Sequence, residues 1–297
     1  MTAAPAPGPA PGPAPAAAPG PTPAAAPAAA QSPDRPRRRL AWTVAAVLGA
    51  LLVIAPVTWQ AWSYGTAQSR VLQGGSGGRP VTALEIVGGD SDVAVTPRGD
   101  HEVGYRAEVS WSLRAPTIEQ SWVGDTLRLT PHCPGADSWV TAGAGCSVRL
   151  RVTVPVGIPV KVTAGGGRVS LSGLGGNVDA RVDSGQVDIT GLRGALRAEI
   201  GSGRLRAADL TSAQAEIRVG SGRADTAFIA PPDHVTARVG SGHLVLTAPA
   251  ATRFRVRCEA GAGHCGVPDA LRDAGSPRTL DIEAASGHAE ASYPDGL

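Results

Sequence analysis

A ten-residue pattern recurs seven times between Val162 and Ala291, and it restricts the fold of this chain more than any other feature. Each copy carries a glycine at the same position, and successive glycines are 18, 18, 19, 20, 21 and 24 residues apart. These glycines are Gly167, Gly185, Gly203, Gly222, Gly242, Gly263 and Gly287. A period near 20 residues that lengthens slowly is typical of stacked coils that tolerate insertions at their turns.

Within each copy, apolar residues stand five and three positions before the glycine and two positions after it. In the third copy these residues are Ala198, Ile200 and Leu205, and the charged Glu199 separates the first two. A period of two predicts β-strands with one buried face. The Ser-Gly pair marks a turn, where glycine relieves the restriction on the backbone. We therefore expect an all-β fold over residues 161–297, a single-stranded parallel β-helix or flattened β-solenoid with coils of about 18–24 residues.

Residues 81–160 are expected to form an N-terminal β cap region for these coils. Leu84 and Ile86, a Gly-Gly-Asp-Ser turn, and then Val93 and Val95 predict one strand–turn–strand unit. Three of the tryptophans also fall in this range, namely Trp111, Trp122 and Trp139. The strands here are expected to be longer, and an antiparallel arrangement stays open for them.

An uncharged apolar run covers residues 41–58 and predicts one transmembrane helix over residues 40–63. Arginines precede this run at positions 37–39, and none follows before Arg70. The positive-inside rule then places a single-pass protein in the cell membrane, with its N-terminus in the cytoplasm and its C-terminal domain outside. A cleaved signal peptide that ends near Gly65-Thr66-Ala67 is the alternative.

Composition sets the two remaining segments apart. Twelve of the 26 prolines lie in the first 36 residues, so residues 1–39 are expected to form a disordered cytoplasmic tail. Residues 64–80 are rich in glycine and serine and predict a flexible linker. The net charge of +2 combines about +3 before residue 65 with about −1 after it. A near-neutral outer domain lacks the basic footprint of a nucleic-acid partner.

Two stretches of sequence carry a resemblance to a known family. ALEIVGGDSDVAV at 83–95 and VTVPVGIPVKVTAGGGRVSLSGLGG at 152–176, with the recurrent Ser-Gly turns, resemble the bacterial putative-adhesin family, a domain of unknown function. The resemblance covers residues 81–293 and implies a repetitive β-helical fold, a surface location, and a role in adhesion or envelope stress. It implies no catalytic residue. This chain has Arg, Gln or His after the turn glycine, where the family more often has an acidic residue.

The four cysteines lie on the predicted outer side, where disulfides persist. Three pairings are possible in principle, and proximity favours Cys133–Cys146 and Cys258–Cys265. The first would contribute about 3 kcal/mol in the chain-entropy model. A metal site that joins the cysteines to His132 and His264 is the alternative, but the spacing matches no zinc pattern. We expect no metal and no cofactor.

The residue after each shared glycine is basic or polar, and stacking of the coils would align these residues in a ladder. They are Arg168, Gln186, Arg204, Arg223, His243, His264 and His288. Such a row suits an anionic polymer or lipid head groups, with stronger binding below about pH 6.5, where histidines become charged. The alternative is a set of solvated turn residues without a partner. Asp183, Asp188 and Asp225 reduce the positive field.

These features favour a non-enzymatic, membrane-anchored, extracytoplasmic protein that is adhesin-like or binds the cell envelope. Its expected partner is an anionic envelope polymer or a surface protein. One alternative is an envelope-stress regulator that signals through its tail. The other is a polysaccharide-active enzyme, but the acidic residues are scattered over the coils instead of converging. Phosphate-loop lysines and a recognisable Ser-His-Asp set are absent from the sequence.

Overall fold

The computed structural model describes residues 42–54, 68–112, 114–134 and 146–294, and it separates into the units Met1–Ala55 and Pro56–Leu297. In the first unit, residues 42–54 form an α-helix whose side chains are exposed. Thirteen residues span about 20 Å, whereas the hydrocarbon core of a bilayer is about 30 Å thick. No helix in the described ranges is long and apolar enough to cross a membrane. The prediction of a transmembrane helix over residues 40–63 is therefore wrong. The predicted tail lies outside the described residues.

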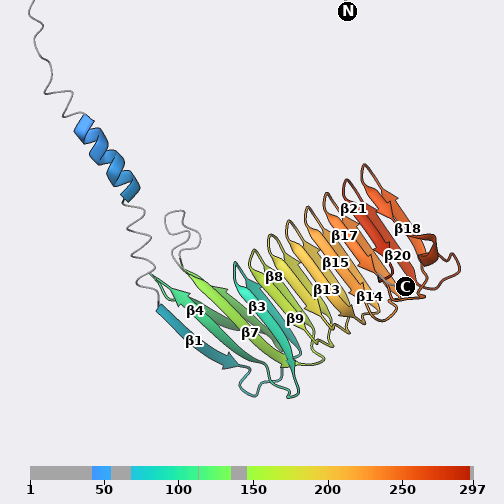
Figure 1. Ribbon diagram of the computed structural model, residues 1–297. Coiled ribbons are helices and arrows are strands. Elements are labelled where there is room, and N and C mark those ends of the chain that lie inside the picture. The colour runs from blue at the N-terminus through green and yellow to red at the C-terminus, as the bar shows by residue number, and fades with distance from the viewer. Residues whose placement is uncertain (1–41, 55–67, 113, 135–145, 295–297) are drawn as a thin grey trace, which may run out of the picture. The chain divides into compact units, whose positions relative to one another are not determined.

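The second unit is all-β, as expected, and its described residues form two sheets that lie face to face (Figure 1). Sheet A contains, in spatial order, β1 (Gln68–Gly75), β4 (Gly104–Trp111), β7 (Ser147–Pro155), β3 (Asp92–Arg98), β9 (Arg168–Ser172), β11 (Gln186–Thr190), β13 (Arg204–Leu210), β15 (Arg223–Phe228), β17 (His243–Thr247), β21 (His288–Ser292) and β19 (His264–Gly266). Sheet B contains β18 (Arg255–Ala260), β20 (Thr279–Ala284), β16 (His234–Val239), β14 (Gln214–Val219), β12 (Leu196–Ile200), β10 (Val178–Val182), β8 (Val160–Ala164), β2 (Ala83–Gly88), β6 (Thr126–His132) and β5 (Thr117–Val123). A short 3-10 helix, η1 (Asp269–Leu271), follows β19.

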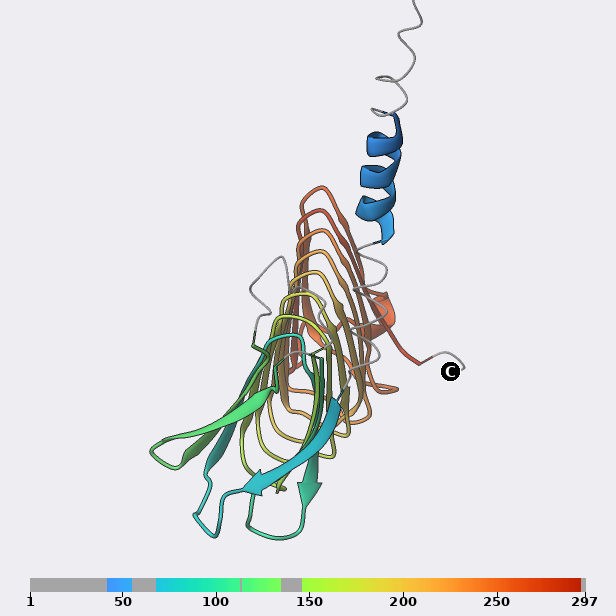
Figure 2. The same ribbon diagram turned by 90° about the vertical axis from the view of Figure 1, so that its left-hand side faces the viewer.

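From β8 onward the chain alternates between the two sheets, and neighbouring strands pair in parallel (Figure 2). The register aligns equivalent residues of successive coils, so that Ala180 lies between Val162 and Ala198. The positions expected to point inward are buried in every coil except the one formed by β18 and β19. There Cys258 is only half-buried and Ala260 is exposed, because this coil lies at the end of the stack and has a neighbour on one side only.

The other end of the stack corrects the predicted fold class. β4 pairs antiparallel with both β1 and β7, and β5 pairs antiparallel with β6. The fold therefore consists of two open, mixed sheets and is not a single-stranded parallel coil behind a membrane helix. For β5 and β6 the physical cause is local: Gly124, at a φ of 61°, allows the two-residue turn that folds β6 back on β5. β1 also occupies part of the predicted linker 64–80, because it pairs with β4 over eight positions.

The order of coils in space differs from their order in the sequence at both ends. The coil of β2 and β3 lies between that of β6 and β7 and that of β8 and β9. In the same way, the coil of β20 and β21 is inserted between that of β16 and β17 and that of β18 and β19. The coil of β2 and β3 and the coil of β20 and β21 therefore each have a neighbouring coil on both sides. The chain ends the stack with β18 and β19, which are pinned together by the Cys258–Cys265 disulfide.

The repeated glycines are required mainly because the backbones of successive coils approach closely. Gly167 has a left-handed φ of 78°, as the turn prediction requires. Gly203 and Gly222 lie outside that region. A Cβ atom on either one would instead overlap the carbonyl oxygen of the glycine in the preceding coil, Gly185 or Gly203. The close approach of neighbouring backbones, and not a left-handed turn conformation, therefore explains why glycine is required at most of the repeated positions.

Candidate functional site

The residues predicted to form a ladder do lie in one row, here called the sheet A row. Each of them begins a strand of sheet A, and their order in space is Arg168, Gln186, Arg204, Arg223, His243, His288 and His264. The backbone fixes this row, because from Gln186 onward each N–H donates a hydrogen bond to a glycine carbonyl of the adjoining coil, whereas the N–H of Arg168 donates to the carboxylate of Asp92. Arg204 donates to Gly185 over 2.9 Å and His243 to Gly222 over 2.9 Å. His288 comes before His264 in space, although it follows it in the sequence, because β21 is inserted between β17 and β19.

The first residues of the sheet A row have partners within the protein. Arg168 lies 3.9 Å from the carboxylate of Asp188 and donates a weak hydrogen bond to Gln186. Gln186 in turn donates to Asp188 over 2.9 Å. These contacts consume much of the hydrogen-bonding capacity of Gln186, so this end of the row is poorly suited to a ligand.

The middle of the row is different, because three arginine side chains gather there without a partner. Arg204 and Arg223 are directly opposite each other on β13 and β15. Arg206 follows on the same face of β13, opposite Asp225. None of the three arginines makes an ion pair or a side-chain hydrogen bond with any residue in the described ranges. Sequence analysis missed Arg206, although a period of two places it beside Arg204 on the same face.

The end of the row is a stack of three exposed imidazoles. The ring centroids of His243 and His288 are 5.4 Å apart and their planes differ by 14°. His264 continues the stack, with its ring centroid 5.6 Å from that of His288. A hollow of about 500 Å³ adjoins these rings, and Arg223 and Glu290 also line it. Glu290 was another residue missed by sequence analysis, although it lies two positions after His288 on the same strand face.

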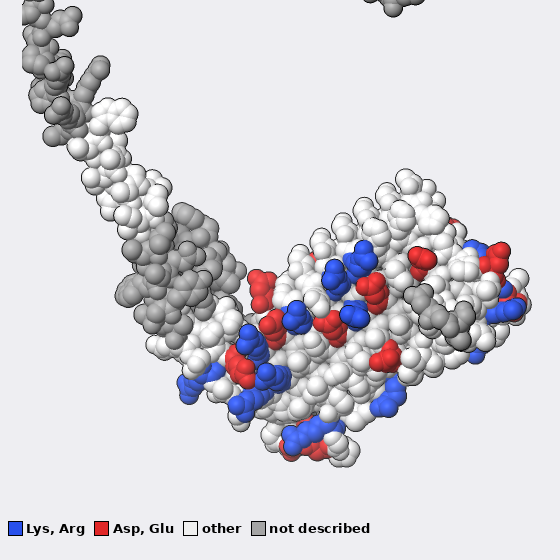
Figure 3. Space-filling model, viewed as in Figure 1, with Lys and Arg blue, Asp and Glu red and all other residues white. Residues whose placement is uncertain are grey.

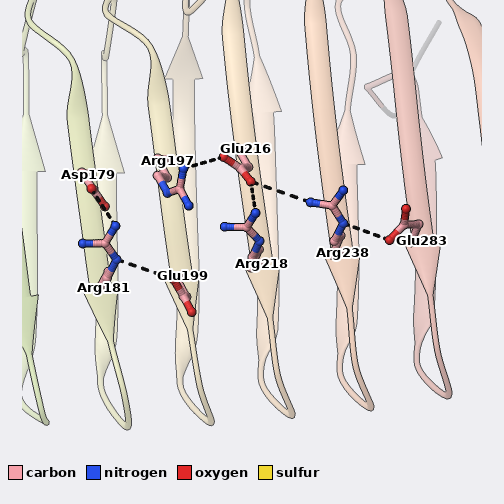
Figure 4. A network of polar contacts seen from close by, with 8 residues as sticks. All are labelled: Asp179, Arg181, Arg197, Glu199, Glu216, Arg218, Arg238 and Glu283. Atoms are coloured by element: carbon pink, nitrogen blue, oxygen red, sulfur yellow. Dashed lines mark hydrogen bonds and ion pairs between the residues drawn. The ribbon is translucent and has the colours of Figure 1, made fainter.

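On the outer face of sheet B, charged side chains are paired with one another (Figure 4). Glu216 contacts Arg197 over 3.1 Å and Arg238 over 3.7 Å, and it also contacts Arg218. Arg238 reaches on to Glu283 over 2.9 Å. A second group joins Asp179, Arg181 and Glu199. Figure 3 shows the opposite face, that of sheet A, where acidic and basic side chains are also interspersed.

The same pairing continues toward the antiparallel end of sheet B. Glu85, which is 14% exposed, accepts hydrogen bonds from Lys161 over 2.9 Å and from Arg128 over 2.7 Å. The ammonium of Lys161, aided by the guanidinium of Arg128, holds the pKa of Glu85 below its usual range, although burial opposes this shift. Glu85 is therefore a charged structural residue that stays ionised to low pH.

A groove of about 710 Å³ crosses the strands of sheet B beside these pairs. Its carboxylates include Glu85, Asp179 and Glu216, and each of them contacts an arginine or a lysine. Glycoside hydrolysis needs two carboxyl groups placed on either side of a bond, one of them protonated. The pairing of these carboxylates with cations does not provide that arrangement.

The cysteines form the two disulfides that sequence proximity favours, Cys133–Cys146 and Cys258–Cys265. The first joins the end of β6 to the start of β7. The second joins β18 to β19, so it holds His264 at the end of the sheet A row. All four cysteines are thus bound to each other and are not available as metal ligands.

Comparison with known proteins gives structural likenesses of low similarity. No protein-family model and no curated protein matches the chain. Among solved structures, a putative cell adhesion protein from Clostridium sporogenes is 13% identical, with a TM-score of 0.31 and coverage of 77% of this chain and 100% of its own. A putative adhesin from Bacteroides fragilis is 14% identical, with a TM-score of 0.36 and coverage of 76% and 97%. A putative lipid binding protein from Parabacteroides distasonis is 14% identical, with a TM-score of 0.38 and coverage of 77% and 97%.

Proposed function

We propose that this chain is a non-enzymatic, extracytoplasmic binding protein that holds a linear anionic polymer of the cell envelope along the sheet A row. The polymer would run along the stack, across the strands, because equivalent residues of neighbouring coils repeat about every 4.8 Å in that direction. Its anionic groups would contact Arg204, Arg206 and Arg223.

The observation that carries this proposal is the cluster of three arginines without partners. Like charges directly opposite each other on neighbouring strands destabilise a sheet. Arg204 and Arg223 are such a pair, and within the described part of the chain no carboxylate contacts either of them. Sheet B also has two arginines directly opposite each other, Arg218 and Arg238, but there each of them contacts a glutamate, Glu216 or Glu283. An external anion would relieve the repulsion on sheet A and gain charge-assisted hydrogen bonds.

An extracytoplasmic location fits the two disulfides, because disulfides persist in oxidising compartments and are rare in the cytosol. The carboxylates of the sheet B groove are engaged with cations, which supports binding instead of hydrolysis as the activity. A surface protein with an acidic patch is the other partner that this row could recognise, and the same experiment separates the two.

The full-length chain is tested for binding to poly(glycerol phosphate) at pH 7.5 and low salt by isothermal titration calorimetry. The double variant Arg204→Ala/Arg206→Ala should bind at least about tenfold more weakly, since each charge-assisted hydrogen bond contributes about 1.5 kcal/mol or more. The matched control is Arg218→Ala/Arg238→Ala, which removes the same charge from sheet B and should bind as the wild type does.

Equal losses in both double variants would show that net charge alone governs binding, and the proposal would fall. If the wild type binds no polymer but binds a purified acidic surface protein, the partner of the row is that protein and not a polymer. Salt adds a second readout, because exposed charge contacts weaken as screening increases.

A further inference from the structure

The hollow at the C-terminal end of the sheet A row has a structural cause. β19 contains only His264, Cys265 and Gly266, so sheet A loses its last strand after three residues. The chain then leaves through Val267 and Pro268 toward η1. Gly266 lines the hollow beside His264 and His288, together with the apolar residues Val267 and Pro268. The Cys258–Cys265 disulfide fixes the short strand that forms this wall.

The charged and titratable groups around the hollow come from four strands. β15 contributes Arg223 and, beside it, Asp225. β21 contributes His288 and Glu290, while β17 and β19 contribute one histidine each. With neutral imidazoles, one arginine faces two carboxylates, and the local balance is −1. Protonation of all three histidines changes this balance to +2.

The imidazoles are arranged for an oxyanion and not for a metal ion. A metal ion needs nitrogens at about 2.0–2.1 Å that converge on one point. Rings that lie nearly parallel at 5.4 Å do not converge, and no group of His, Cys, Asp and Glu in the described ranges is placed to hold a metal. Two N–H···O hydrogen bonds of about 2.7–2.9 Å to one tetrahedral anion can bridge rings at this separation.

We infer that this hollow is a proton-dependent phosphate site. A phosphate group accepts hydrogen bonds from His243 and His288, with His264 and the guanidinium of Arg223 at its sides. The substituent of the phosphate lies toward Val267 and Pro268. This inference rests on the proposed function, since it makes the hollow the end of the same ligand-binding row, and it adds the phosphate class and the pH dependence.

The direction of the pH dependence follows from the charges. Histidines become charged between about pH 8 and pH 5. Neighbouring imidazolium groups repel each other, so a bound dianion favours the protonated stack and the stack in turn favours the dianion. Binding should therefore strengthen as the pH falls from 8 to 6. Inorganic phosphate itself changes from a dianion to a monoanion over the same pH range, so sulfate, which keeps both charges, serves as a second probe.

The test uses the full-length chain and the Cε1–H NMR signals of its histidines. Inorganic phosphate is titrated at pH 6.0 and pH 8.0. The signals of His243, His264 and His288 should shift saturably at pH 6.0, with at least about tenfold weaker binding at pH 8.0. His234, whose ring nitrogen lies 3.0 Å from the hydroxyl oxygen of Thr279 on sheet B, and the exposed His101 serve as internal controls.

The variant His288→Asn removes the middle ring, which is exposed, so the fold should be retained. It should lose the saturable response at pH 6.0, whereas His234→Asn should keep it. Shifts in His234 and His101 that equal those of the stack, or a response that does not saturate, would overturn the inference. A response that requires poly(glycerol phosphate) at equal phosphate concentration would identify the polymer as the source of the phosphate, and a response to inorganic phosphate alone would identify a small phosphate.

The two proposals fail separately. If phosphate leaves the stack unperturbed while Arg204→Ala/Arg206→Ala still weakens polymer binding at pH 7.5, only the phosphate site is refuted. If phosphate binds the stack but the arginine variants bind polymer as the wild type does, the polymer-binding function is refuted and the hollow stands as a small-anion site.

Discussion

The outer faces of sheets A and B are built on the same coil repeat, yet they place their charges differently. On sheet B, residues directly opposite each other tend to have opposite sign, as Arg197 and Glu216 do. On sheet A, Arg204 lies opposite Arg223, and on sheet B, Arg218 lies opposite Arg238. Of these two pairs, only the sheet B pair contacts glutamates within the described residues. Because both faces are built on the same coil repeat, the difference lies in the acidic side chains that surround each arginine pair. Sheet B uses its charges within the protein, and sheet A leaves some of them for a partner.

The two faces also respond to acid in opposite directions. If the proposed phosphate site is correct, falling pH strengthens the attraction of sheet A for anions. Falling pH eventually protonates the carboxylates of sheet B, which removes their ion pairs. At Glu85, whose pKa is lowered, this loss comes late, so mildly acidic pH leaves its pairs with Lys161 and Arg128 in place.

The largest effect is expected where both faces depend on one structure, the glycine turn that joins them. Gly222→Ala should lower the free energy of unfolding by about 2–3 kcal/mol, because the added methyl overlaps the carbonyl oxygen of Gly203. Urea denaturation measures this change. Ser221→Ala, at the exposed neighbouring position, should change stability by less than about 0.5 kcal/mol. A Gly222→Ala variant as stable as the wild type would show that the coils can separate without cost.

A smaller effect is expected at Glu85 on sheet B. Glu85→Gln should lower stability by about 1–2 kcal/mol at pH 7, because it removes two ion pairs from a mostly buried carboxylate. The folded-state pKa is lowered below the unfolded value of about 4.3, so the contribution is full above that value and disappears as pH falls through the folded pKa.

Urea denaturation of the wild type and of Glu85→Gln at pH 7, 5 and 3 measures how far the difference between their stabilities shrinks as the pH falls. Glu102→Gln, at an exposed position, should differ little from the wild type throughout. A stability difference for Glu85→Gln that stays constant down to pH 3 would contradict the role given to its charge.

The smallest effect on stability is expected from a change that makes sheet B resemble sheet A. Glu216→Gln leaves Arg197 and Arg218 without a carboxylate partner and should cost about 1 kcal/mol. Placed in the Arg204→Ala/Arg206→Ala background, it should restore measurable binding of poly(glycerol phosphate). Calorimetry measures this gain, and Glu119→Gln, which changes the same charge at an exposed position of β5, is the control. Equal restoration by both variants would show that net charge, and not unpaired arginines, decides binding.

Much of the stack could be predicted because its repeat carries several signals at once. The period of two identified the buried face, and the shared glycines aligned the residues of the sheet A row. Proximity in sequence was enough for both disulfides. The same glycine alignment also places Arg197 opposite Glu216, so the repeat contains the information that predicts this sheet B pair.

Other features depend on information that a repeat does not contain. A repeat identifies coils but not their order in space, so the positions of His288 and His264 could not be known before the pairing of β21 was seen. Glycine and serine predicted a linker at Gln68–Gly75, but the hydrogen bonds offered by β4 outweigh a low strand propensity. Apolar composition alone predicted the membrane helix, and the described helix is too short for that role.

The inserted final coil has a consequence for how the chain reaches its native state. A stack in which each coil joins the previous one can grow from the ribosome in the order of synthesis. Here β18 and β19 are made before β20 and β21, yet they must remain apart from β16 and β17 so that the last coil can enter. The native stack is therefore completed only after residue 292 has been synthesised. Until then β18 and β19 can pair with β16 and β17, in the place that β20 and β21 occupy in the native stack. Late folding is therefore a competition between two pairings of the same strands.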